Sequence, residues 1–105
     1  MTMSKIRWSK MNKPSPKRLG VTFLGHVQGV GFRVNAIQQA GGLDITGFVR
    51  NQPDGSVYLD AQGPSTDVDQ LLQRIKRSMA SQIDEVNIDE RPPMPDRQGF
   101  VIRDW

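Results

Sequence analysis

The 105-residue sequence has no cysteine and a single histidine, His26. The lack of cysteine excludes disulfides, thiolate metal sites and a thiol nucleophile, and one imidazole cannot form a histidine metal cluster. No apolar run reaches the length of a membrane span or of a secretory signal core. A chain of this length can form one small domain with one hydrophobic core. We therefore expect a single soluble, cytoplasmic domain.

Acidic residues are absent from the first 18 residues, which carry six basic ones, whereas the remaining residues carry eight basic and eleven acidic residues. The net charge of +3 therefore combines a basic segment with a mildly acidic remainder. The segment has two prolines and no apolar periodicity, so we predict a disordered tail over 1–17 and a folded domain over 18–105. Basic arms can bind nucleic acid or anionic lipid. This one is short and has no motif, which favours an incidental extension.

Hydrophobic periodicity predicts an alternation of strands and helices after the tail. The clearest element is a helix that begins near Thr66, a candidate N-cap, and ends near Met79, with apolar residues three and four positions apart. A shorter helix over 34–40 is followed by two glycines that end it. Period-two alternation predicts strands near 21–27, 45–51, 56–62, 85–89 and 100–102. The order β-α-β-β-α-β-β predicts an α+β, ferredoxin-like α/β sandwich, in which both helices cover one face of an antiparallel sheet.

The segment between the first strand and the first helix carries the strongest functional signal. It contains Gly25, Gly29 and Gly31 and ends on Arg33. Glycine allows a backbone to approach a ligand and to adopt positive φ, and a turn that enters a helix directs several N–H groups at one point. An arginine adds a planar, charged fork suited to phosphate oxygens. The segment therefore predicts an anion-binding loop.

Two familiar nucleotide-binding patterns do not fit this loop. Val30 stands where the phosphate-loop pattern requires its second glycine, and Val34 replaces the last glycine of the dinucleotide pattern. The rest of the chain offers no other sign of a nucleotide site.

The loop resembles the hallmark of the acylphosphatase family, Gly-x-Val-Gln-Gly-Val-x-Phe-Arg, which here spans Gly25 to Arg33. The family's second motif, Gly-aromatic-Val-x-Asn, is matched by Gly47 to Asn51, and its hairpin motif begins at Asp54-Gly55. The motifs occur in the family's order and spacing, and the resemblance runs from about Leu19 to the C-terminus. It implies the ferredoxin-like fold and an enzyme that hydrolyses acyl phosphates to a carboxylate and inorganic phosphate.

The resemblance also implies which residues carry the reaction. The Arg33 guanidinium would hold phosphoryl oxygens, and the Asn51 carboxamide would orient the attacking water. Backbone N–H groups would complete the phosphate-binding loop, formed by Gln28, Gly29, Val30, Gly31, Phe32 and Arg33. His26 lies opposite the apolar face of its strand and is interpreted as an exposed, incidental residue.

Hydrolysis of an acyl phosphate makes modest chemical demands on a protein. The leaving carboxylate has a conjugate acid with a pKa of about 4, so it needs no general acid. The remaining tasks are to hold the phosphoryl group, spread its charge and place a water in line. We therefore expect no metal and no cofactor, and we expect inorganic phosphate to be both product and competitive inhibitor. We also expect the enzyme to be a monomer.

The chain departs from the usual family pattern at four positions in three places. Val34-Asn35 follow the arginine where aromatic residues are common, Phe48 replaces a frequent tryptophan, and Asp44 stands where glycine is common. An aspartate that ended the first helix in the left-handed conformation would be strained, so replacing it with glycine would be expected to stabilise the domain.

Two other functions remain open at this point. Similar domains occur within hydrogenase-maturation proteins, which would imply handling of carbamoyl phosphate. Ferredoxin-like sheets also serve as RNA-binding or other ligand-binding modules without catalysis. The mildly acidic domain and the single tyrosine, Tyr58, argue against a nucleic-acid partner.

Overall fold

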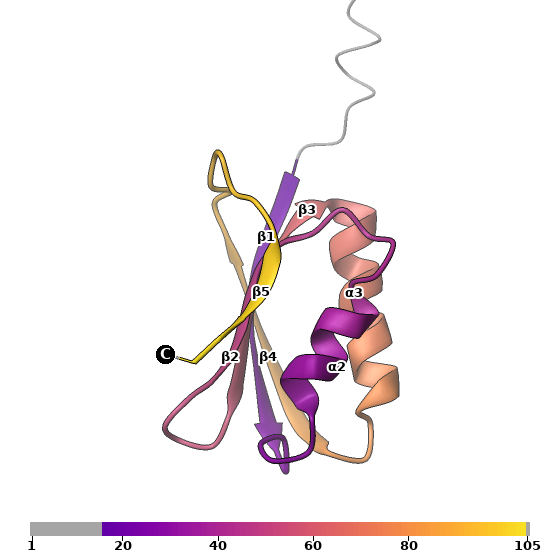
Figure 1. Cartoon of the computed structure of the whole chain (residues 1–105), viewed down its shortest axis with the longest axis vertical. Coiled ribbons are helices and arrows are strands. Elements are labelled where there is room, and N and C mark those ends of the chain that lie inside the picture. Colours follow the sequence, from indigo (N-terminus) through magenta and orange to yellow (C-terminus); the bar gives the residue numbers. More distant parts are fainter. Residues whose placement is uncertain (1–15, 105) are drawn as a thin grey trace, which may run out of the picture.

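A computed structural model describes residues 16–104 of the chain. It contains five strands and two helices in the order β1 (Pro16–Gly25), α2 (Phe32–Gln39), β2 (Thr46–Asn51), β3 (Val57–Pro64), α3 (Ser65–Ser78), β4 (Ile83–Arg91) and β5 (Phe100–Arg103). The strands form one sheet in the order β4-β1-β3-β2-β5. Both helices lie on the same face of this sheet, so the molecule has two layers (Figure 1). The predicted α+β, ferredoxin-like fold is confirmed.

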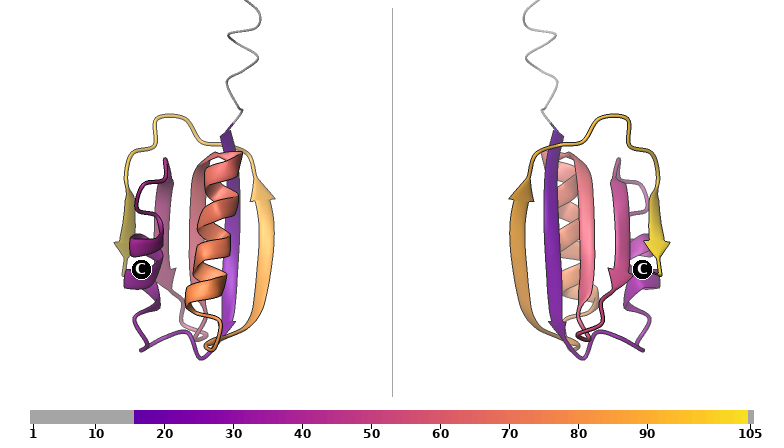
Figure 2. Two further views of the ribbon diagram at one scale, coloured as in Figure 1. Left: turned by 90° about the vertical axis from the view of Figure 1, so that its right-hand side faces the viewer. Right: turned by 90° about the vertical axis from the view of Figure 1, so that its left-hand side faces the viewer.

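Helix α3 packs against the sheet through one apolar side, because its apolar residues recur three and four positions apart. Its buried residues are Val68, Leu71, Leu72 and Ile75. They pack against the apolar positions of the central strands, which alternate with polar ones facing the other way. Helix α2 buries only Phe32 and Ala36 and packs between α3 and the β2–β5 side of the sheet, as the side views show (Figure 2).

Strand β5 runs parallel to β2, whereas the other three strand pairs are antiparallel. The sheet is therefore mixed. The prediction of a wholly antiparallel sheet is wrong for β5 alone. The reason is the loop after β4, which crosses from one edge of the sheet to the other before β5 begins (Figure 2). As a result, β5 ends beside the end of β2, where Arg50 is paired with Arg103.

Several element boundaries differ from the sequence predictions. Strand β1 begins at Pro16, where it pairs with Pro64 of β3, so two residues of the predicted tail belong to the sheet. The rest of that predicted tail, residues 1–15, lies outside the described residues. Helix α3 begins at Ser65 after Pro64, and no side chain caps it, so the Thr66 cap is wrong.

The turn after α2 relieves the strain expected at Asp44. Gly42 adopts the left-handed conformation, with φ of 80°, and Asp44 does not. The Asp44 N–H instead donates to Asp67 Oδ2 at 2.8 Å. Arg74 of α3 donates to the carbonyl oxygens of Gln39 and Gly41, which satisfies the end of α2. The expected gain from an Asp44→Gly substitution therefore has no basis.

Candidate active site

The glycine loop leads from the end of β1 into the first turn of α2. Gly29 and Gly31 have φ of 77° and 78°, a conformation that L side chains rarely adopt. A Cβ at either position would meet nothing within 4 Å. Glycine is therefore required here by the backbone conformation and not by a lack of space. Gly31 is the N-cap of α2 and makes no side-chain cap hydrogen bond. The first N–H groups of α2 therefore lie beside the glycine loop, with the positive end of the helix dipole.

The side chain of Gln28 ties this loop to the hairpin between β2 and β3. Its Nε2 donates to the carbonyl oxygens of Gln52 and Ser56, each at 2.8 Å. The Gln52 N–H also donates to the Ser56 carbonyl oxygen at 2.9 Å, which closes the hairpin turn. The glycine loop and the residue that follows Asn51 are therefore held together by one amide.

Arg33 is the second residue of α2, and its side chain remains 32% exposed. Its Nη1 donates to Asp104 Oδ1 at 3.2 Å, and the Asp104 side chain is 90% exposed. An ion pair as exposed as this one is weak, because water screens it. The guanidinium is therefore positioned by a contact that a stronger anion could replace.

Asn51 ends β2 and lies on the same side of the sheet as the buried Val49, the side that the helices cover. Arg33 and Asn51 line one depression of about 220 Å³, which opens to solvent. Its other lining residues are Gly29, Gly31, Val34, Ile102 and Asp104. Three chain segments meet here because the start of α2 and the ends of β2 and β5 lie at the same end of the molecule (Figure 1).

The other predicted loop residues have different surroundings. The Phe32 side chain is buried, and its ring lies 4.9 Å from that of Phe23, so it anchors the start of α2 in the core. Val30 is partly buried and packs against the same core. Only the main-chain groups of these two residues are candidates for ligand contact. Their apolar side chains hold the loop, which explains why the pattern alternates glycine with apolar residues.

The sequence reasoning missed Asp104 and Ile102 as lining residues and the Gln28 side chain as a link. The positions of Asp104 and Ile102 follow from the parallel direction of β5, which brings the end of that strand beside Arg33. No motif in the sequence signals this direction. The link through Gln28 could not be predicted without knowing where the hairpin between β2 and β3 lies. A glutamine within a glycine loop was nevertheless a sign that its side chain makes a specific contact.

The other titratable residues noted in the sequence lie away from this depression. His26 is exposed as predicted, and its main-chain N–H donates to the Gln82 carbonyl oxygen at 2.9 Å. Hydrogen bonds from the Ser56 hydroxyl and N–H lower the pKa of Asp54 in the hairpin turn. Within residues 16–104, no group of three histidine, cysteine or carboxylate residues is arranged to hold a metal ion.

No helix within the described part of the chain is long and apolar enough to cross a membrane.

Comparison with known proteins agrees with the resemblance seen in the motifs. Residues 19–102 match the model of the acylphosphatase family. The chain is 35% identical over 94 residues to an acylphosphatase of Salinibacter ruber, covering 89% of this chain and 99% of that protein. It is 40% identical over 88 residues to an acylphosphatase of Caldivirga maquilingensis, covering 82% of this chain and 93% of that protein.

A solved structure supports the same assignment. The crystal structure of acylphosphatase from Bacillus subtilis superimposes with a TM-score of 0.76 at 27% identity, covering 83% of this chain and 98% of that chain. The family match spans the glycine loop, α2 and β2, and so includes every residue that lines the depression except Asp104. The chain belongs to the acylphosphatase family.

Proposed function

We propose that the depression between Arg33 and Asn51 is the active site for acyl phosphate hydrolysis. The activity of the enzyme is the hydrolysis of carboxyl-phosphate anhydrides to a carboxylate and inorganic phosphate. The observation that carries the assignment of the site is the shared cavity, where Arg33 and Asn51 meet Gly29 and Gly31 although the two side chains come from different elements.

Arg33 has the chemistry to bind the phosphoryl group. Its guanidinium can donate two parallel hydrogen bonds to phosphoryl oxygens, and it lies next to the N–H groups of the loop over 28–33. Positive φ at Gly29 and Gly31 shapes the backbone around the anion. Donors that are already in place stabilise the charge that the equatorial oxygens carry in the transition state. The exposed Asp104 carboxylate would yield to a bound phosphoryl group, because the two anions compete for one guanidinium.

Asn51 has the chemistry to place the attacking water. Its carboxamide oxygen can accept from the water while its NH₂ group donates to a phosphoryl oxygen, and neither group titrates. The water then attacks phosphorus in line, the bond between phosphorus and the carboxylate oxygen breaks, and the bonding pair leaves with the carboxylate. The water's protons pass to a phosphoryl oxygen and to solvent. No general acid is needed, because the leaving group is a weak base.

We further propose that the enzyme uses no metal or cofactor, that it acts as a monomer in the cytoplasm, and that inorganic phosphate competes with substrate. Competition by phosphate follows from the loop, because the product carries the same oxygens that the substrate presents to Arg33. The absence of a metal follows from the chemistry, in which the arginine and the N–H groups supply the positive charge.

Hydrolysis of benzoyl phosphate in the presence of EDTA tests this proposal. We expect saturable hydrolysis that EDTA does not reduce, with competitive inhibition by inorganic phosphate. Hydrolysis abolished by EDTA and restored by a divalent cation would contradict the metal-free mechanism. Inhibition by phosphate that is not competitive would contradict the anion-binding loop.

A further inference from the structure

The face of the sheet opposite the helices carries a concentration of positive charge. No helix of the described chain covers this face (Figure 2). Residues 16–104 contain ten basic and eleven acidic residues, so they are almost neutral overall. Half of those basic residues nevertheless line or border this one face, and we call the surface they form the arginine face: Arg18, Arg50, Arg91, Arg97 and Arg103, together with Phe48 and Tyr58.

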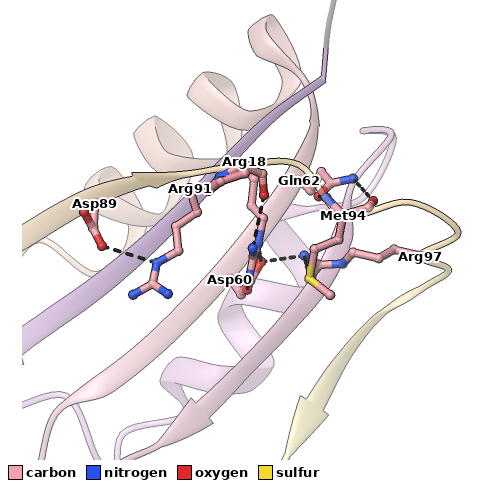
Figure 3. Close-up of polar contacts among 8 residues, drawn as sticks. Arg18, Asp60, Gln62, Asp89, Arg91, Met94 and Arg97 are labelled. Carbon is pink, nitrogen blue, oxygen red and sulfur yellow. Dashed lines mark hydrogen bonds and ion pairs between the residues drawn. The ribbon is translucent and has the colours of Figure 1, made fainter.

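The acidic residues of this face are fewer, and two of them are already bound by arginines. Asp60 is only 3% exposed and accepts from Arg18 at 2.7 Å and from Arg97 at 2.9 Å (Figure 3). Asp89 Oδ2 lies 3.2 Å from Arg91 Nε. The third, Glu85, lies on the same side of β4 by alternation. Asp96 and Asp104 lie at the border of the face, where they line neighbouring depressions with Arg97 and Arg50. Among the described residues of the face itself, five guanidinium groups and three carboxylates give a net positive charge.

Two aromatic rings lie between the arginines, on adjacent strands. Phe48 on β2 and Tyr58 on β3 have ring centres 6.0 Å apart, and both are partly exposed. The Arg103 guanidinium lies 4.1 Å from the centre of the Phe48 ring. Gly20 on β1 leaves room for Tyr58, because a Cβ there would meet the tyrosine hydroxyl group. The glycine therefore lets the ring lie over the neighbouring strand.

A depression of about 450 Å³ connects the rings with the arginines at both edges of the sheet. Arg103 lies on β5 and Arg18 on β1, three strand spacings apart, or about 14 Å at the usual distance between strands. A single small anion would contact one end of this surface, whereas an extended polyanion can contact both. Planar groups along the polyanion could stack on the Tyr58 ring and on the Arg103 guanidinium, which covers Phe48.

We propose that the arginine face binds single-stranded nucleic acid without sequence preference. The arginines would contact successive phosphates, and the bases would stack on Tyr58 and on the Arg103 guanidinium, which lies over the Phe48 ring. This binding is separate from catalysis, because Arg33 and Asn51 lie on the other side of the sheet. The overall acidity of the domain argued against nucleic acid only because the sequence does not show how the charges are distributed.

The charge contribution can be tested by fluorescence anisotropy with the full chain and a labelled 12-nucleotide oligoadenylate RNA at low salt. The variant R91Q/R103Q removes two charges from the arginine face, and K76Q/R77Q removes two exposed charges from α3. Both variants keep residues 1–15, so any contribution of that segment is equal. We expect the first variant to weaken binding about tenfold and to lower the salt slope by about 1.4, the value for two lost phosphate contacts on a single strand. We expect less than a twofold change in the second.

The stacking contribution is tested by F48L/Y58L, which should weaken binding to the single strand by about tenfold or more and leave binding to a duplex of the same length almost unchanged. Hydrolysis of benzoyl phosphate at the unaltered rate shows that each variant is folded. The single variant R91Q is a milder change, because the Arg91 side chain is 45% exposed. Equal losses in the two charge variants, or no binding by the unaltered chain at low salt, would overturn the proposal.

Discussion

Gln28 Nε2 donates to the main-chain carbonyl oxygen of Gln52 at 2.8 Å, which joins the phosphate-binding loop to the residue that follows Asn51. The same nitrogen donates to Ser56 at 2.8 Å, so one side chain spans both strands of the hairpin. The distance between the proposed phosphate site and the proposed water-positioning residue therefore depends on this amide. Gln28 is therefore a positioning residue, because it acts through the main-chain carbonyl groups of Gln52 and Ser56.

Replacing Gln28 with methionine keeps the side-chain volume and removes the amide. We expect a loss of about 1–2 kcal/mol in the free energy of unfolding, because two hydrogen bonds to partly buried carbonyl oxygens are lost. We also expect kcat to fall about tenfold while KM changes little, since a looser hairpin misplaces the water. Q73M, on the exposed side of α3, is the control. A fall in stability with unaltered kcat would limit Gln28 to a structural role.

Asp104 should weaken phosphate binding, because its carboxylate occupies Arg33 in the absence of ligand. We expect D104N to lower the inhibition constant of inorganic phosphate about two- to fivefold, the range for a solvent-exposed ion pair. D96N is the matched control, because it removes the same charge at a site where asparagine tolerates the positive φ of 60°. If both variants lower the constant equally, the effect is one of net charge and Asp104 has no special role.

Asn51→Ala should reduce kcat by about a hundredfold with a change of less than about threefold in KM. The reason is that water placement matters in the transition state, whereas Arg33 and the loop still bind the phosphoryl group. Steady-state kinetics with benzoyl phosphate measure both values, and N87A on the exposed part of β4 serves as the control. A rise in KM with unaltered kcat would make Asn51 a binding residue only.

The buried carboxylate of Asp60 should make stability depend on acid pH. Burial raises the pKa of Asp60, but hydrogen bonds from Arg18 and Arg97 outweigh it, so the folded-state pKa lies below the ordinary value. The resulting stabilisation is present above the unfolded-state pKa, about 3.9, and is lost as pH falls through the folded-state pKa.

We expect D60N to cost about 2–4 kcal/mol in the free energy of unfolding at pH 7, because two arginines lose their charged partner. The difference between D60N and the unaltered protein should shrink as pH falls below about 4. Urea denaturation at pH 7 and at pH 3 measures this. A difference that stays constant, or grows in acid, would contradict the assigned direction of the pKa.

The sequence predicted those parts of the fold that depend on local periodicity and on glycine chemistry. The spacing of Val68, Leu71 and Ile75 gave α3, and the glycine loop led directly to Arg33 and the start of α2. The direction of β5 could not be predicted, because Phe100 and Ile102 alternate in the same way in a parallel or an antiparallel strand. The position of Asp104 follows from that direction, so it was missed for the same reason.

The polar side of the sheet was equally hidden in the sequence. Arg18, Asp60 and Arg97 are far apart in the chain, and only the strand order brings them together. A count of charges by segment separated the basic N-terminal residues from an acidic remainder. It could not show that the arginines of that remainder gather on one face.

The role of Arg33 is measured by the rate of benzoyl phosphate hydrolysis by Arg33→Lys, compared with that by Arg77→Lys on the exposed end of α3. Lysine keeps the charge of Arg33 but cannot donate two parallel hydrogen bonds to the phosphoryl oxygens. We predict that kcat/KM falls at least about a hundredfold in Arg33→Lys, while its midpoint of unfolding and the activity of Arg77→Lys stay unchanged. An activity within a few-fold of the unaltered enzyme would contradict the assignment of Arg33 as the phosphoryl-binding residue.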